Sequence, residues 1–207
     1  MGRQAELESL QGAVTQLGAT DTTTVLIGGE AGVGKTRLVS EMSGAATAAG
    51  ARVLTGACVA LGAESLPYAP FSQALGELAD GLGRAGVREL VGDAARAELA
   101  RLVPELRHSG DEARPAGATD RAVLFAAVLR MVEGSAVAAP LVVVLEDLHW
   151  ADASSRELLG FLIGRLRGQV LIVATYRSDE LHRRHPLRPL LAEATRDERS
   201  CGWSSRR

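Results

Sequence analysis

The chain has 207 residues, a formal net charge of −2, and a hydrophobic fraction of 46%. This length suits one α/β domain, or one domain with part of a second, and the near balance of charge gives no electrostatic footprint for nucleic acid. Cys58 and Cys201 lie far apart in no metal-ligand spacing, and no apolar run is long enough to cross a bilayer. These properties predict a cytoplasmic protein without disulfides, structural zinc or a membrane segment.

The first predicted elements are a helix, a strand and a second helix. The leading helix carries one apolar face, formed by Leu7, Leu10, Val14 and Leu17. Residues 23–27 are β-branched or apolar without interruption, which predicts a buried parallel strand. After residue 36 apolar residues recur at helical spacing until Gly50, a natural C-terminal stop.

Between that strand and that helix lies Gly-x-x-x-x-Gly-Lys-Thr, residues 29–36, the spacing of a phosphate-binding P-loop, or Walker A motif. It contains the only lysine of the chain, Lys35, whose compact charge on a flexible stem can reach phosphate oxygens. We predict that Lys35 contacts the β- and γ-phosphates of ATP and that Thr36 is a magnesium ligand. The alternative is a glycine-rich turn with an incidental lysine. The predicted nucleotide-binding residues are Gly29, Glu30, Ala31, Gly32, Val33, Gly34, Lys35, Thr36 and Arg37.

The middle of the chain gives weaker signals. Residues 52–55 predict a second strand, and residues 66–71 are expected to be extended, because each proline disfavours helix at the residue before it. Glycines interrupt helical stretches between residues 72 and 107, and residues 111–119 predict a loop. A helix is expected over residues 120–133, with Val123, Leu124, Ala127, Val128 and Met131 facing inward.

Five consecutive apolar residues, 141–145, predict a central parallel strand that ends in Glu146 and Asp147. Open α/β sheets bind ligands at this end of their strands, so the pair is interpreted as a Walker B motif. We assign Glu146 to Mg²⁺ and Asp147 to activation of the attacking water, with both carboxylates available to the metal. The order is the reverse of the familiar Asp-Glu pair, and the alternative is a strand end with solvated acids.

A further helix is expected after an N-cap at Asp152 or Ser154. Residues 169–175 then predict a fourth strand, which delivers Tyr176 and Arg177 to the sheet edge that carries the acidic pair. Arg177 is a candidate catalytic residue that senses the γ-phosphate. The alternative is an ordinary surface or ion-paired arginine.

Several motifs occur together in one order: Gly2-Arg3 before a helix, the P-loop, residues 66–71, residues 146–152 (Glu-Asp-Leu-His-Trp-Ala-Asp) and residues 175–180. This arrangement resembles the AAA-like ATPase domain of large LuxR-type, MalT-like bacterial regulators, the STAND ATPases, over residues 2–192. Similar domains precede some nucleotide cyclase and kinase modules. The resemblance implies a P-loop NTPase three-layer α/β sandwich with a mostly parallel sheet, in which the strand of Arg177 lies between the P-loop strand and the Walker B strand.

The same resemblance implies a slow ATPase that acts as a switch and binds ATP or ADP with Mg²⁺. Its output is self-association or contact with a partner protein. The family pattern continues into a fifth strand beside the P-loop strand, whereas residues 195–207 show no strand alternation. We therefore expect an ATP-binding domain over residues 1–192 that lacks its last strand, an irregular, disordered tail over residues 193–207, and a fragment without DNA-binding output.

Other functions stay open at this point. The chain could bind nucleotide without turnover as an interaction module, or belong to a nucleotide cyclase or kinase regulator. Residues 182–188 form a basic run, but no recognition helix stands behind it, so direct DNA binding is not expected. A P-loop kinase of small molecules would need a lid or substrate-binding motif, and none stands out.

Overall fold

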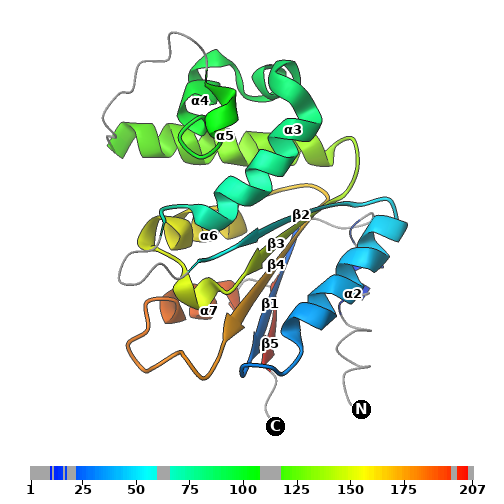
Figure 1. Cartoon of the computed structure of the whole chain (residues 1–207), viewed down its shortest axis with the longest axis vertical. Helices are drawn as coiled ribbons and strands as arrows, with labels where there is room; N and C mark the ends of the chain where they lie inside the picture. Colours follow the sequence, from blue (N-terminus) through cyan, green and yellow to red (C-terminus); the bar gives the residue numbers. More distant parts are fainter. Residues whose placement is uncertain are drawn as a thin grey trace.

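The computed structural model describes residues 10, 12–15, 17, 22–59, 66–107, 118–196 and 200–204, with the backbone alone for residues 118–120 and 200–204. A parallel sheet forms the middle layer, with helix α2 on one face and helices α3, α5, α6 and α7 on the other (Figure 1). The predicted α/β sandwich is therefore confirmed.

The sheet contains five strands among the described residues, in the order β2-β3-β4-β1-β5, and every neighbouring pair is parallel. Strand β4 lies between β1 and β3, as the resemblance implied. The strands that feed the P-loop, Arg177 and the acidic pair are thus adjacent. Their bounds are β1 Thr23–Gly29, β2 Arg52–Ala57, β3 Leu141–Glu146, β4 Val170–Arg177 and β5 Ser200–Ser204.

The expectation that the last strand is missing is wrong. Strand β5 pairs in parallel with β1, from Thr24 opposite Ser200 to Gly28 opposite Ser204. Residues 193–194 also belong to a helix, α7 Arg188–Ala194, so the expected irregular tail contains regular structure on both sides of residues 197–199, which lie outside the described residues. Main-chain hydrogen bonds to a buried strand can order a segment that has no alternating side-chain pattern, because backbone groups at a strand edge need partners.

The helices follow most of the sequence expectations, although α3 runs through Gly81 and Gly86 and is interrupted only by a kink at Gly83. Leu10, Val14 and Leu17 of the leading helix are buried, while Leu7 lies outside the described residues. Helix α5 starts before the predicted residue 120, and residues 111–117 of the predicted loop lie outside the described residues. The bounds are α2 Lys35–Ala48, α3 Ala69–Val91, α4 Asp93–Leu99, η1 Pro104–Leu106, α5 Ala118–Ala136, η2 Leu148–Trp150 and α6 Ala153–Arg165.

Two local expectations fail. Residues 66–71 are not extended throughout, because α3 begins at Ala69 with Pro70 in its first turn, where the missing N–H of a proline costs no helical hydrogen bond. Val123 of α5 is 37% exposed, whereas the other four residues of the predicted inward face are buried. Within the described part of the chain, no helix is both long and apolar enough to span a membrane.

Side chains alternate across the sheet and divide the core into two parts. Val142 and Val144 of β3 pack with Leu38 and Met42 of α2, while the intervening Val143 belongs to the core under α3, α5 and α6. Glu146 continues the even-numbered positions of β3, so it lies on the face of the sheet that α2 covers.

Candidate functional site

The P-loop joins β1 directly to α2. Gly32 and Gly34 adopt left-handed conformations, with φ of 70° and 93°, which any residue with a Cβ would strain. Apart from the glycine and its chain neighbours, no atom of the described residues lies within 4 Å of the position that a Cβ would take at either glycine, so backbone conformation rather than crowding calls for glycine here. The loop therefore keeps its main chain open at the carboxyl edge of the sheet.

The N-terminus of α2 is without a side-chain cap. Gly34 is the N-cap and, having no side chain, makes no capping hydrogen bond, and the first turn contains no acidic residue. The first N–H groups of a helix have no partner inside the helix, and the helix dipole places partial positive charge there. An anion such as phosphate is the complementary ligand for this arrangement.

Lys35 folds back over the loop. Its Nζ donates to the carbonyl oxygens of Gly29 at 2.8 Å and Glu30 at 2.9 Å. Both contacts are to main-chain oxygens at the start of the loop, so the ammonium lies beside the P-loop backbone. Thr36 is exposed at the first turn of α2.

Arg37, the last predicted nucleotide-binding residue, points along α2. Its Nε donates to Glu41 Oε1 at 2.8 Å, and its side chain is 85% exposed. That hydrogen bond raises the pKa of Arg37, and the charge of Glu41 adds to it. The structure thus pairs Arg37 with a helix neighbour one turn away.

The acidic pair occupies the end of β3. Burial raises the pKa of Glu146, and the negative charge of Asp147 adds to the rise. Asp147 has φ 58°, ψ 43°, a left-handed conformation, and begins the short helix η2. Its N–H donates to Thr175 Oγ1 of β4 at 3.1 Å. The sequence motif contained Thr175 but gave no partner for it, because Asp147 lies in the turn after another strand.

His149 connects this turn to the end of β4. Its side chain is inaccessible to solvent, and its Nδ1 accepts the N–H of Arg177 at 3.3 Å. Burial lowers the pKa of His149; Glu180 and Asp147 oppose that shift, and Arg177 and Lys35 reinforce it. The sequence motif contained His149 but gave no partner for it.

Arg177 is ion-paired within its own turn. Its Nη1 contacts Glu180 Oε1, and its Nη2 lies 3.9 Å from Asp179 Oδ2. In the β1–β4 register Arg177 stands opposite Gly29, the first residue of the P-loop, and Ser178 N donates to Gly29 O at 3.3 Å. The end of β4 is therefore fixed beside the start of the loop.

Asp152 is the N-cap of α6, as the sequence predicted for Asp152 or Ser154. Its carboxylate accepts the N–H groups of Ser154 at 2.8 Å and Ser155 at 3.1 Å, and also the Ser155 hydroxyl. The N–H of Tyr68 donates to the same carboxylate at 3.2 Å. Asp152 thus ties the start of α3 to the loop after β3.

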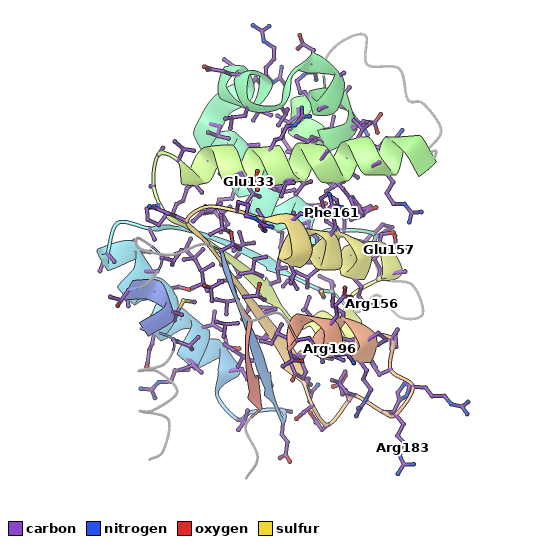
Figure 2. All side chains as sticks on the ribbon, turned by 180° about the vertical axis from the view of Figure 1, so that it is seen from behind. Glu133, Arg156, Glu157, Phe161, Arg183 and Arg196 are labelled. Carbon is purple, nitrogen blue, oxygen red and sulfur yellow. The ribbon has the colours of Figure 1, made fainter. Side chains whose placement is uncertain are left out.

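The basic run after β4 folds on itself. Arg188 donates from Nε to His182 O at 3.1 Å and from Nη2 to Leu181 O at 3.2 Å. Helix α7 begins only at Arg188 and is seven residues long, and Arg183 extends outward from the preceding turn (Figure 2). Over these residues the chain forms a turn rather than a recognition helix.

The donor set for a cation consists of hard oxygen ligands. Within the described ranges, no group of three or more His, Cys, Asp or Glu side chains is arranged to hold a metal ion. Mg²⁺ needs no such cage, because it keeps several waters and uses one or two carboxylates together with substrate phosphates. Thr36, Glu146 and Asp147 fit that requirement by their chemistry.

A glycine loop between a buried strand and an uncapped helix, with acids on a nearby strand of a parallel sheet, defines the P-loop NTPase class. The comparison with known families agrees: a model described as "AAA ATPase domain" matches residues 1–173. The chain therefore belongs to the AAA ATPase domain family.

A curated relative is an uncharacterized protein of Rhizobium meliloti (strain 1021). It is 28% identical over 226 aligned residues, which cover 100% of this chain and 22% of the relative. The chain thus spans about a fifth of the length of that protein.

Proposed function

We propose that this chain binds ATP with Mg²⁺ and hydrolyses it slowly, as the switch domain of a signal-transduction regulator. The observation that carries the proposal is the juxtaposition of Lys35, Arg177 and the Glu146–Asp147 pair at the carboxyl ends of β1, β4 and β3, three neighbouring strands of one sheet. Open α/β sheets bind their ligands at this edge.

Each residue has a defined task in this proposal. The amides of residues 29–37 and the ammonium of Lys35 would bind the phosphates, and Thr36 and Glu146, with Asp147 as a further carboxylate ligand, would hold Mg²⁺. The metal, when bound, neutralises charge on the β- and γ-phosphate oxygens. Asp147 orients the attacking water and accepts its proton, and Arg177 stabilises the charge that develops on the γ-phosphate.

The regulatory part of the proposal rests on the motif resemblance of residues 146–152 and 175–180 to LuxR-type, MalT-like STAND ATPases. In the Rhizobium relative the matching stretch is 22% of the protein, so there the domain is part of a longer chain. In such a regulator the ATP form permits self-association or contact with a partner protein, and the ADP form prevents it.

The test of the binding step is a titration with fluorescent ATP, with and without Mg²⁺. We expect Lys35→Ala to weaken binding at least about tenfold, because an ammonium–phosphate hydrogen bond contributes roughly 1.5–3 kcal/mol. Arg84→Ala is the matched control, since it removes one positive charge from an exposed position of α3. Equal affinity of the wild type and Lys35→Ala would refute the proposal.

A second function, nucleotide binding without turnover, is favoured by one observation. The second residue of the acidic pair, to which we assign water activation, is an aspartate, one methylene shorter than the usual glutamate. A single-turnover hydrolysis assay at saturating protein separates the two functions: measurable phosphate release that depends on Asp147 supports the ATPase, and bound but uncleaved ATP supports the binding module.

A further inference from the structure

Glu180 faces two different donors with its two carboxylate oxygens. Its Oε1 contacts Nη1 of Arg177, and its Oε2 lies 3.5 Å from Nε2 of His149. His149 in turn comes from the loop after β3, so Glu180 stands between the strand ends that carry the acidic pair and Arg177.

The hydrogen bonds of His149 define where its proton is. Because Nδ1 accepts the N–H of Arg177 at 3.3 Å, a neutral imidazole carries its hydrogen on Nε2. That Nε2 is buried and has no hydrogen-bond partner among the described residues, although Glu180 Oε2 is its nearest acidic oxygen. The N–H at Nε2 of His149 is therefore an unused donor, and Glu180 can reach it by a short side-chain movement.

The guanidinium of Arg177 also has N–H donors that are not fully used. Its Nε is buried without a hydrogen-bond partner in the described part of the structure, and its Nη2 is 3.9 Å from Asp179 Oδ2. The strand register holds Arg177 opposite Gly29 at the entrance of the P-loop. A guanidinium in this position can exchange one anionic partner for another without movement of the strand.

We propose that Glu180 and His149 are positioning residues that form a latch on Arg177. Without a γ-phosphate, Glu180 holds the guanidinium. When ATP is bound, Arg177 pairs with the γ-phosphate, and Glu180 turns to accept the hydrogen of His149 Nε2. The latch rests on the proposed ATP site. It makes ATP binding compete with an internal carboxylate, whereas ADP, which has no γ-phosphate, meets no such competition.

The test compares Kd values for a non-hydrolysable Mg·ATP analogue and for Mg·ADP in the full chain. Glu180→Gln removes the competing charge, so we expect it to tighten ATP-analogue binding about twofold to fivefold, the range of a partly exposed ion pair, and to leave ADP binding unchanged. Glu157→Gln is the matched control, because Glu157 pairs with Arg121 between α6 and α5, away from the sheet edge (Figure 2).

Two substitutions of His149 separate the latch from a merely structural role. Asparagine can accept the Arg177 N–H as Nδ1 does but offers no donor at Nε2, whereas glutamine can place an amide N–H near Nε2. We expect His149→Asn to weaken ATP-analogue binding relative to ADP and His149→Gln to preserve the wild-type ratio. A structural role would lower the melting temperature in both without changing that ratio.

The outcomes are decisive in either direction. Suppose that Lys35→Ala loses nucleotide binding and that Glu180→Gln keeps the wild-type ratio of the Kd for the ATP analogue to the Kd for ADP. This result overturns the latch but keeps the ATP site. Unchanged nucleotide binding in Lys35→Ala overturns the ATP site itself. If Glu180→Gln does not fold, the contrast between His149→Asn and His149→Gln decides, and equal ratios in these two variants overturn the latch.

Discussion

Thr175 of β4 accepts the backbone N–H of Asp147 through its hydroxyl oxygen at 3.1 Å, across 28 positions of sequence. This hydrogen bond fixes the left-handed turn that follows β3. Thr175 thus links the ends of these two strands by a side chain, in addition to their ladder and to the His149–Arg177 hydrogen bond.

The first prediction concerns this hydroxyl. Thr175→Val keeps the shape but leaves the Asp147 N–H without its acceptor, so we expect a loss of about 1–3 kcal/mol in the free energy of unfolding, measured by urea denaturation. Because the turn carries Asp147, single-turnover hydrolysis should slow while ATP affinity is retained. Thr175→Ser, which keeps the hydroxyl, is the control, and the prediction fails if both variants lose the same stability.

The second prediction concerns Asp147 itself. Asp147→Asn keeps the size of the side chain but removes the base, so we expect ATP hydrolysis to slow about a hundredfold or more, in line with loss of a general base. Binding of a non-hydrolysable analogue should stay within about twofold of the wild type. Unchanged turnover would remove Asp147 from the water-activating position.

The third prediction concerns Asp152. Asp152→Ala removes the cap of α6 and the tether to Tyr68, so we expect the free energy of unfolding to fall by about 1–2 kcal/mol. Asp152→Asn retains an oxygen for the cap and should lose less. Ser154→Ala is the control, because Ser154 takes part in the cap through its backbone N–H. Equal stability of Asp152→Ala and Ser154→Ala in thermal melts would contradict the prediction.

The fourth prediction concerns pH. Burial raises the pKa of Cys58 from 9.0 to about 12, and the charges of Asp152 and Asp147 contribute to the rise. The folded thiol therefore stays protonated where the unfolded thiol ionises. This contribution to stability is fully present below pH 9 and is lost as the pH rises towards 12.

Alkylation with iodoacetamide checks this prediction, in a Cys201→Ser background that leaves a single thiol. At pH 8.5 the folded protein should react far more slowly than the same protein in urea, because the thiolate is the nucleophile. Equal rates in both conditions would show that the Cys58 thiol is not buried and that its pKa is not raised.

Local sequence signals predicted much of this architecture. The apolar runs of β1 and β3 identified central strands, and the glycines and Lys35 located the P-loop, because these signals lie within a few consecutive residues. The capping role of Asp152 could likewise be predicted, because the N–H groups that it accepts are only two and three residues away.

Contacts between distant segments were not predictable. Thr175 with Asp147, and His149 with Arg177, are pairs that meet only once the sheet has assembled. Strand β5 was missed for a related reason: its residues carry no alternation of apolar and polar types, and its order comes from main-chain pairing with β1. The roles assigned to Glu146, Asp147 and Arg177 stay predictions.

The pairing of β1 on both sides has a mechanical consequence. The strand that leads into the phosphate loop is clamped between β4 and β5, so its amides should be among the slowest to exchange with deuterium. Movement that follows nucleotide exchange is then expected in the turns after β3 and β4, which lie beyond the strand ladders and are held by side-chain contacts of Thr175, His149 and Glu180. The rigid part of the domain would hold the phosphates, and the compliant part would report which nucleotide is there.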